Sequence, residues 1–587
     1  MLRTPRLALS ATAGFSIFFL GLFAAMAPNA AAATLSCDPA TLGAALPASL
    51  NATITSATAL TTPVSYCDVV GTIATSTYGQ PGSVGFEVGL PVTWNGRFLF
   101  IGGGGYVGSL LVGDSEFPPV LEAGFAAATT DAGHESELGP LAELDGSYAL
   151  LPDGQPNQAG REDFADRAVH LSTVVGQTLA EAYYEVSAMN SYFDGCSTGG
   201  RQAMVEAQKY PTDYHGIVAG DPAIGYPIAG FNWNDQALLA NTDNYLPPAK
   251  VELLDSAVLA ECDDLDGVPD GLIQDPRKCH FDPASIECSS GDEPTCLTAG
   301  QVATVDAIYS GAKTSIGQQL YPGYTASDPG GPDGWEEWIT GFVTPTFGVA
   351  DPWGTTPLPS FEEAPFQWSF QDQFMKYYLF DNPNADSLSF DFGNYYEVLQ
   401  LVKLSSAYQG NGQNPNLQPF FSHGGKLLMY HGWSDPALTP FVSVDYYTSA
   451  AKAANAHPSN VHYTSIFKFG MSADAQASGG LYDILRENAR LFMVPGMHHC
   501  SGGPGPNVFD PLSPLIEWAE GGPAPDGIIA AHYPNNDGTP PPDRTMPLCA
   551  YPETAVYDGT GNVDLASSWT CEEPSSSYSA TSHKVKN

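Results

Sequence analysis

The chain has 587 residues, of which 43% are hydrophobic and 11% aromatic, which is enough to form a large folded core. Its formal net charge is −43, with only 21 lysines and arginines. This negative charge would repel nucleic acid and anionic membrane surfaces, so we exclude nucleic acid as a partner and expect no stable membrane association.

The first residues have the pattern of a secretory signal. Arg3 and Arg6 precede an apolar run over residues 7–27, and residues 31–33 are small alanines suited to cleavage. We expect residues 1–33 to be a signal peptide and the mature protein to be secreted, either extracellular or periplasmic. A retained membrane anchor is the alternative, because the apolar run is near spanning length.

The mature chain begins with predicted strands and a glycine run. Residues 84–90 and 97–101 have strand-like patterns, and residues 102–105 are four consecutive glycines. This run is either a plain flexible loop or a backbone that approaches a ligand closely and offers it N–H groups. In the second case, Gly104 is our candidate donor to an oxyanion.

The central motif is Gly-Cys-Ser-Thr-Gly at residues 195–199. Gly-x-Ser-x-Gly is the pattern of a nucleophile elbow, in which a serine occupies a sharp turn between a strand and a helix. The pattern alone is weakly specific, but an apolar strand precedes it and a helix is predicted over residues 198–210. Ser197 is therefore the candidate nucleophile, and the N–H of Thr198 is a candidate oxyanion donor.

The pattern changes over residues 226–424 to loops rich in proline, glycine and aspartate. Helices are predicted at 247–262 and 297–313, but strands and helices do not alternate there. We expect an insertion that forms a lid over a hydrolase sheet. The aromatic stretch at 366–392 is either the core of this lid or one wall of an aromatic-binding cleft.

Within this lid, residues 262–273 carry closely spaced aspartates with glycines between them. Carboxylates this close repel one another unless a cation lies between them, and Ca²⁺ prefers carboxylate and carbonyl oxygens in such loops. The spacing is not that of an EF-hand. An exposed acidic turn without a metal is the alternative.

The strand pattern resumes after residue 425, and each of two strands ends at a candidate catalytic group. Residues 426–431 precede Asp435, and residues 490–494 precede His498 and His499. The chain order serine, aspartate, histidine is that of the α/β-hydrolases. Position alone does not choose between the two histidines. Asp435 as a turn cap and His431 as an ordinary strand histidine remain alternatives.

The ten cysteines are an even number, which favours disulfides formed in an oxidising compartment. Proximity in the sequence suggests the pairs Cys37–Cys67, Cys262–Cys279, Cys288–Cys296 and Cys549–Cys571. This leaves Cys196, which precedes Ser197, and Cys500, which follows His499. A bridge between them would tie the candidate nucleophile to the candidate base. Cys196 as the nucleophile itself is a disfavoured alternative.

Four segments together resemble the tannase and feruloyl esterase family. They are residues 195–202 (GCSTGGRQ), 430–436 (YHGWSDP), 495–503 (PGMHHCSGG) and the loop at 262–279. The resemblance covers nearly all of the mature chain. It implies an α/β-hydrolase fold with a large inserted lid, in which residues 34–225 and 425–587 form the hydrolase domain and residues 226–424 the lid.

The resemblance also implies roles for individual residues. The family arrangement makes Ser197 the nucleophile, Asp435 the orienting acid and His499 the base, and pairs Cys196 with Cys500, which selects His499 over His498. It further implies a structural Ca²⁺ in the lid. The expected ligands are the side chains of Asp263, Asp266 and Asp270 and the carbonyls of Val268 and Leu272.

The expected function is a secreted serine carboxylic ester hydrolase that cleaves small aromatic acid esters, of the feruloyl or galloyl type, through an acyl-enzyme. Hydrolysis of mono-hydroxyethyl terephthalate is the alternative within the same family. That branch uses a lid arginine for the substrate carboxylate, whereas this chain has no arginine between Arg277 and Arg486. A non-catalytic binding protein with a hydrolase fold is the remote alternative.

Overall fold

The structure is a computed structural model that describes residues 31–573, apart from residues 33, 188, 332, 355, 357–363, 409–411, 457–479, 535 and 537–540. The expected signal peptide, apart from Ala31 and Ala32, lies outside the described residues.

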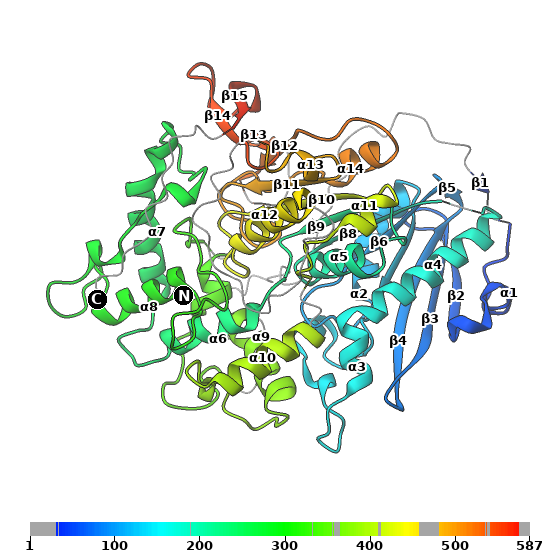
Figure 1. Cartoon of the computed structure of the whole chain (residues 1–587), viewed down its shortest axis with the longest axis horizontal. Helices are drawn as coiled ribbons and strands as arrows, with labels where there is room; N and C mark the ends of the chain where they lie inside the picture. Colours follow the sequence, from blue (N-terminus) through cyan, green and yellow to red (C-terminus); the bar gives the residue numbers. More distant parts are fainter. Residues whose placement is uncertain are drawn as a thin grey trace, which may run out of the picture.

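A mixed sheet of nine strands forms the centre of the molecule (Figure 1), in the order β11-β10-β9-β8-β6-β7-β4-β3-β2. The strands from β11 to β7 are parallel, β4 is antiparallel to β7, and β2, β3 and β4 form an antiparallel meander at the blue edge of the sheet. Because parallel strands end at the same edge, the loops after β8, β9, β10 and β11 lie close together. The strands are β2 (Ala52–Leu60), β3 (Tyr66–Thr77), β4 (Gln80–Pro91), β6 (Arg97–Ile101), β7 (Ala126–Thr130), β8 (Asn190–Cys196), β9 (Gly216–Gly220), β10 (Lys426–Gly432) and β11 (Ala489–Val494).

Helices cover both faces of the sheet, because side chains along each strand alternate between the faces. In β6, Phe98 and Phe100 belong to one buried cluster, whereas Leu99 and Ile101 belong to another. Helices α4, α5 and α12 pack on the first face, and α2 and α14 pack on the second. This confirms the predicted α/β-hydrolase fold. The helices before β9 and after β10 are α1 (Pro39–Ala45), α2 (Leu111–Glu122), α3 (Gln158–Glu162), α4 (Ala168–Tyr184), α5 (Thr198–Lys209), α12 (Phe441–Asn455), α13 (Asp483–Arg486) and α14 (Leu512–Ala519).

The segment between β9 and β10 contains helices and no named strand among its described residues. It lies to one side of the sheet in Figure 1, in green to yellow-green, and has a buried cluster of its own that includes Trp335 and Trp368. The predicted helices at 247–262 and 297–313 correspond to α7 and α8. The helices of this segment are α6 (Pro227–Leu238), α7 (Pro248–Cys262), α8 (Ala299–Ser310), α9 (Phe366–Phe374), α10 (Tyr395–Tyr408) and α11 (Gln418–Ser422).

Three two-stranded sheets complete the described structure. They are formed by β1 (Ala31–Ala32) with β5 (Thr93–Trp94), β12 (Gly527–His532) with β13 (Arg544–Cys549), and β14 (Thr554–Tyr557) with β15 (Trp569–Glu572).

All ten cysteines are paired in five disulfides: Cys37–Cys67, Cys196–Cys500, Cys262–Cys279, Cys288–Cys296 and Cys549–Cys571. Such a content is typical of proteins from oxidising compartments. Within residues 31–573, leaving aside the gaps, no helix has both the length and the apolar character needed to cross a membrane.

Candidate active site

Ser197 occupies the turn between β8 and α5, with φ of 62° and ψ of −122°. This conformation is rare for a non-glycine residue and is held by its surroundings. The Ser197 N–H donates to the Gly220 carbonyl at 3.0 Å, and its own carbonyl accepts the N–H of Ala223 at 3.0 Å. The turn is therefore fastened to the end of the neighbouring strand β9.

The glycines of the elbow are required by close approach of backbone. A Cβ atom at Gly195 would lie 2.7 Å from the carbonyl carbon of Gly199, and one at Gly200 would lie 2.2 Å from the Gly220 oxygen. Both distances are shorter than van der Waals contact, so a side chain would force the helix away from the strand. The sequence motif is thus explained by the packing of α5 against β8 and β9.

The four-glycine loop after β6 packs against this elbow. A Cβ at Gly102 would lie 2.7 Å from the Gly199 Cα, and the Thr198 hydroxyl donates to the Gly105 carbonyl at 2.7 Å. The loop therefore lies where the second oxyanion donor of an α/β-hydrolase is expected.

Three amides of this loop already have partners. The Gly102 N–H donates to the Asp194 carbonyl at 2.9 Å. The Gly103 N–H donates to the Gln202 side-chain oxygen at 3.2 Å, and the Gly104 N–H faces the carboxyl group of Glu143. Burial raises the pKa of Glu143, and the contact with Gly104 opposes that rise. An oxyanion would reach the Gly104 amide only after this carboxyl group had moved.

Asp435 lies in the loop after β10 and is buried. Its Oδ1 accepts the N–H groups of Ala437 at 2.7 Å and Leu438 at 2.9 Å, and its Oδ2 lies 2.9 Å from His499 Nδ1. Burial by itself raises the pKa of Asp435, but the charge of His499 and the hydrogen bonds from His431 and His499 hold the pKa well below its usual range. The low pKa favours the ionised carboxylate, whose Oδ2 meets the His499 ring at Nδ1.

The two adjacent histidines have different partners. His498 Nε2 lies 3.0 Å from the carbonyl oxygen of Asp328, and its Nδ1 lies 3.5 Å from the Asp333 carboxylate. His498 thus anchors the segment between β9 and β10, whereas His499 meets Asp435. The structure separates two histidines that residue position did not distinguish.

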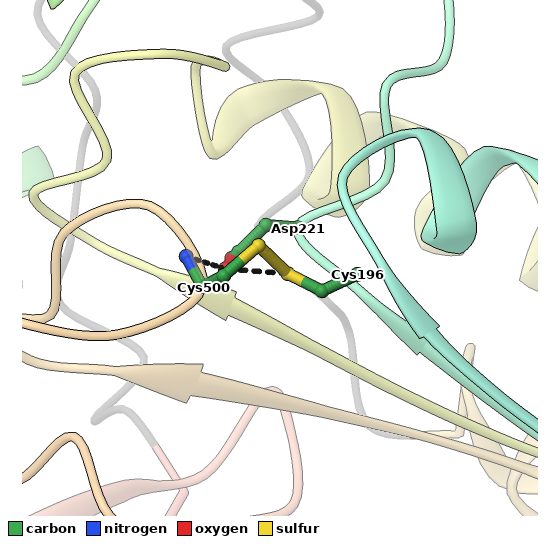
Figure 2. Close-up of side chains that lie close together, drawn as sticks. All are labelled: Cys196, Asp221 and Cys500. Atoms are coloured by element: carbon green, nitrogen blue, oxygen red, sulfur yellow. Dashed lines mark hydrogen bonds between the residues drawn. A yellow bond between two sulfur atoms is a disulfide. The ribbon is translucent and has the colours of Figure 1, made fainter. Parts of the chain in front are cut away.

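The disulfide Cys196–Cys500 joins the strand before Ser197 to the loop that carries His499, with a Cα–Cα distance of 6.0 Å. Since neighbouring Cα atoms are about 3.8 Å apart, the Cα atoms of Ser197 and His499 are at most about 14 Å apart. Figure 2 shows Asp221 beside this bridge, with its carboxylate against Cys500.

Sequence reasoning missed Asp221 and treated His431 only as a possible ordinary strand histidine. Both are fully buried, and His431 Nε2 lies 3.2 Å from the Asp435 carboxylate. Asp221 directly follows β9 and His431 lies near the end of β10. Their place at the carboxyl ends of parallel strands was the available signal, because functional groups gather there.

The segment expected to form a lid is bound directly to the loop that carries Asp435. Tyr324 donates its hydroxyl to the Ala437 carbonyl at 2.8 Å, and Thr325 donates to the Trp433 carbonyl at 2.6 Å. These contacts and those of His498 connect the segment to both loops of the site.

Aromatic rings from the same segment lie beside His499. The Trp338 ring is edge-on to the His499 ring at 4.7 Å and contacts Phe366 and Phe370, with ring centroids 5.0 and 6.4 Å away. Trp368, on the same helix α9, is fully buried. Within the aromatic stretch, Trp368 therefore belongs to the core of the segment, while Phe366 and Phe370 pack on the ring that lies beside His499.

The acidic loop has carboxylates that match a cation site. Asp263 Oδ1 accepts three backbone N–H groups, from Asp270, Gly271 and Leu272, at 3.0 to 3.2 Å. The buried oxygens Asp266 Oδ2, Asp270 Oδ1 and Asp270 Oδ2 have no hydrogen-bond partner. Burial raises the pKa of Asp266 to about 6. Buried carboxylate oxygens without hydrogen bonds are costly, although Asp270 Oδ2 lies 3.5 Å from Arg544 Nη1 in an ion pair. Hard oxygen ligands of this kind fit Ca²⁺.

This loop also touches the site. A Cβ at Gly496, three positions before His499, would lie 2.3 Å from Leu272 Cδ1. Leu272 is fully buried in a cluster with Val268, Met546 and Trp569. The acidic loop therefore packs against the strand end from which the His499 loop departs.

Comparison with known proteins decides the family. The model of the family described as tannase and feruloyl esterase matches residues 67–572. The chain belongs to this family. It is 30% identical to a mono(2-hydroxyethyl) terephthalate hydrolase of Piscinibacter sakaiensis, across 87% of this chain and 85% of that protein. It is 29% identical to a probable feruloyl esterase B-1 of Aspergillus flavus, across 86% of each chain.

A solved structure agrees with this assignment. Feruloyl esterase B from Aspergillus oryzae superposes with a TM-score of 0.72 at 25% identity, covering 91% of this chain and 99% of the other. As a member of the family, the protein is a carboxylic ester hydrolase.

Proposed function

We propose that this member of the tannase and feruloyl esterase family is a secreted serine esterase that cleaves esters of phenolic aromatic acids through an acyl-enzyme. The observation that carries the proposal is the His499 Nδ1 to Asp435 hydrogen bond at 2.9 Å, on a loop that a disulfide joins to the Ser197 elbow. Five disulfides support secretion.

In the first half-reaction, Ser197 Oγ attacks the ester carbonyl carbon while His499 Nε2 takes the hydroxyl proton. Asp435 keeps the other ring proton on Nδ1 and stabilises the imidazolium. The Thr198 N–H stabilises the oxyanion, and the Gly104 N–H joins it once the Glu143 carboxyl group has moved. The intermediate then expels the alcohol, which receives the proton from His499.

In the second half-reaction, water attacks the acyl-enzyme. His499 takes a proton from this water and returns it to Ser197 Oγ as the C–O bond to the serine breaks. The free aromatic acid leaves, and the enzyme is restored without any redox cofactor.

The pH profile of kcat/KM tests the role of His499. Burial lowers the pKa of His499, but the charge and hydrogen bond of Asp435 and the charge of Asp221 raise it above its ordinary value of 6.5. The base must be neutral, so activity is lost as pH falls through this pKa. We expect the acid limb of the profile, over which kcat/KM falls with decreasing pH, to lie above pH 6.5. A profile that stays flat down to pH 5 would contradict His499 as the base.

Charge near the site favours a neutral acyl group over a carboxylate. Lys376, the cation of the aromatic stretch, is buried and lies 2.8 Å from both Asp372 and Asp351. It is therefore engaged and not available for a substrate carboxylate. Glu337 lies near His499, and burial raises its pKa to about 7. A terephthalate monoester would bring its own negative charge toward these groups.

A panel of three esters tests this preference. We expect kcat/KM for methyl ferulate or methyl gallate to exceed that for mono-hydroxyethyl terephthalate by roughly tenfold or more, since one unpaired charge costs more than 1.4 kcal/mol. The rates are measured by product chromatography at equal enzyme concentration. If the terephthalate monoester is the best of the three, the phenolic preference is wrong.

We further propose that the acidic loop binds a structural Ca²⁺ through the side chains of Asp263, Asp266 and Asp270 and the carbonyls of Val268 and Leu272. The support is the set of buried carboxylate oxygens without hydrogen bonds described above, of which Asp270 Oδ2 also faces Arg544. Bound there, the ion would neutralise the repulsion among these carboxylates and hold the loop on the cluster around Leu272.

Removal of the metal tests this site. Because an ion that binds only the folded state stabilises it, chelation is expected to lower Tm, and added Ca²⁺ to restore it. Asp266→Asn should lose both the bound metal and the response to chelator. Asp264→Asn is the control, since Asp264 is exposed and outside the ligand set. Unchanged metal content and Tm after exhaustive chelation would show that the loop is only a turn.

A further inference from the structure

The carboxylate of Asp435 contacts two histidines. Its Oδ2 lies 2.9 Å from His499 Nδ1 and 3.2 Å from His431 Nε2, and its Oδ1 accepts two backbone N–H groups. Four donors thus surround one buried carboxylate. A serine–histidine–aspartate triad requires only one of the two imidazoles, so His431 is left without an assigned role.

The surroundings of His431 determine where its proton lies. Its Nε2 is surrounded by acceptors: the Leu438 carbonyl at 3.0 Å, Asp435 Oδ2 at 3.2 Å and Asp221 Oδ1 at 3.8 Å. This nitrogen therefore carries a hydrogen. Its Nδ1 lies 2.8 Å from the Ser443 hydroxyl, which can donate to a neutral ring or accept from a charged one. His431 can thus gain a proton and still keep its position and its hydrogen bond to Ser443.

Asp221 connects three parts of the site with one carboxylate. Its Oδ1 accepts the Gly432 N–H at 2.8 Å, on the loop toward Asp435, and its Oδ2 accepts the Cys500 N–H at 2.6 Å, next to His499. The same Oδ2 lies 3.3 Å from Cys196 Sγ (Figure 2). This last approach is a contact and no S–H hydrogen bond, because a disulfide sulfur carries no hydrogen.

We propose that Asp221 and His431 are positioning residues that hold Asp435 and the His499 loop in place and set the pH at which His499 begins to work as a base. The inference rests on the proposed function, since it takes His499 as the base. Asp221 acts through the Cys500 and Gly432 amides and through its charge, and His431 acts through Asp435.

The charged groups that face His499 have opposing effects on its pKa. After burial, which lowers it, the Asp435 charge and hydrogen bond raise the pKa most, Asp221 raises it further, and His431 lowers it by less. Glu337, from the π-helical turn η8 (Glu336–Thr340), also faces His499. Burial raises the pKa of Asp221 to about 6, with His431 opposing, so above that pH Asp221 is mostly negative.

The decisive variant is Asp221→Asn. Asparagine has a single acceptor oxygen and no charge, so it cannot accept from both amides and does not favour the imidazolium. We expect kcat to fall and the acid limb of kcat/KM to move to lower pH by roughly half a unit or more. A purely structural role would lower the plateau without moving the limb. Asp194→Asn is the matched control, because Asp194 is a buried carboxyl group of the adjacent strand β8 and its charge is not among those that chiefly shift the pKa of His499.

His431→Gln is the second variant, and it decides the question if Asp221→Asn does not fold. Glutamine can still donate an N–H but lacks the ring and its charge. Because His431 acts on the base through Asp435 and does not touch the substrate, we expect kcat to fall ~10-fold with KM unchanged. A kcat within about twofold of wild type, or a loss seen only in KM, would overturn the role of His431.

Different results would contradict the positioning role of Asp221 and His431 and the proposed function. An acid limb that stays at the wild-type pH in folded Asp221→Asn, or moves equally in Asp194→Asn, overturns this inference while the triad stands. A wild-type enzyme without an acid limb, or one that keeps its activity in Ser197→Ala, overturns the proposed function itself.

Discussion

Ser197→Ala is expected to lower kcat by ~10⁴-fold or more while leaving the fold intact. The variant lacks the nucleophile, so only substrate binding and oxyanion stabilisation remain. Alanine is the smallest change at a position whose φ of 62° is held by hydrogen bonds of the backbone. Hydrolysis of a chromogenic aromatic ester, measured beside circular dichroism and Tm, checks both parts of the expectation.

Ser115→Ala is a suitable control. Ser115 lies on α2, and its hydroxyl bonds within that helix, to the Val112 carbonyl and to the Glu116 side chain. This variant should keep wild-type kcat and KM. Near-normal hydrolysis by Ser197→Ala would remove the serine mechanism, whereas an equal loss in both variants would point to a folding defect.

The double variant Cys196→Ala, Cys500→Ala is expected to lose both stability and activity. The bridge joins positions 304 residues apart. The chain-entropy model assigns roughly 6 kcal/mol to such a loop, as an upper value because strain and residual structure in the unfolded state reduce it. The bridge also sets the distance between the elbow and the His499 loop, and misplacing reacting groups by about an ångström costs ~10²-fold in rate.

The matched control removes the bridge Cys288–Cys296, which closes a separation of only 8 residues. The same model gives about 2.5 kcal/mol for that loop. Its loss should lower Tm without changing kcat per folded molecule. We expect the Cys196, Cys500 variant to lose activity beyond its folded fraction, measured well below Tm. Equal specific activity in both variants would show that the Cys196–Cys500 bridge stabilises the fold without positioning the catalytic groups.

The succession of strand, elbow and helix along the chain around Ser197 could be predicted from the sequence. These features depend on residues that are neighbours in the chain: the short apolar runs of β6, β10 and β11, the glycines around Ser197, and Pro211 after α5. A local pattern predicts a local conformation because the backbone and the nearest side chains determine it. The four short-range disulfides follow the same logic of proximity.

The roles of the charged groups were decided by the tertiary structure. Residue position did not separate His498 from His499, and the family resemblance supplied that choice. In the structure the partner of His499, Asp435, is 64 residues away, and that of the Cys500 amide, Asp221, is 279 residues away.

The same holds for His431 and for the aromatic stretch, in which Trp368 is buried in the core while Phe366 and Phe370 pack on Trp338 beside His499. The sequence alone determined which chemical groups the protein carries and the local turn that presents Ser197. Only the parallel sheet, by bringing the ends of β8, β9, β10 and β11 to one edge, determined which of those groups meet. A hydrogen bond depends on separation in space, and separation along the chain does not encode it.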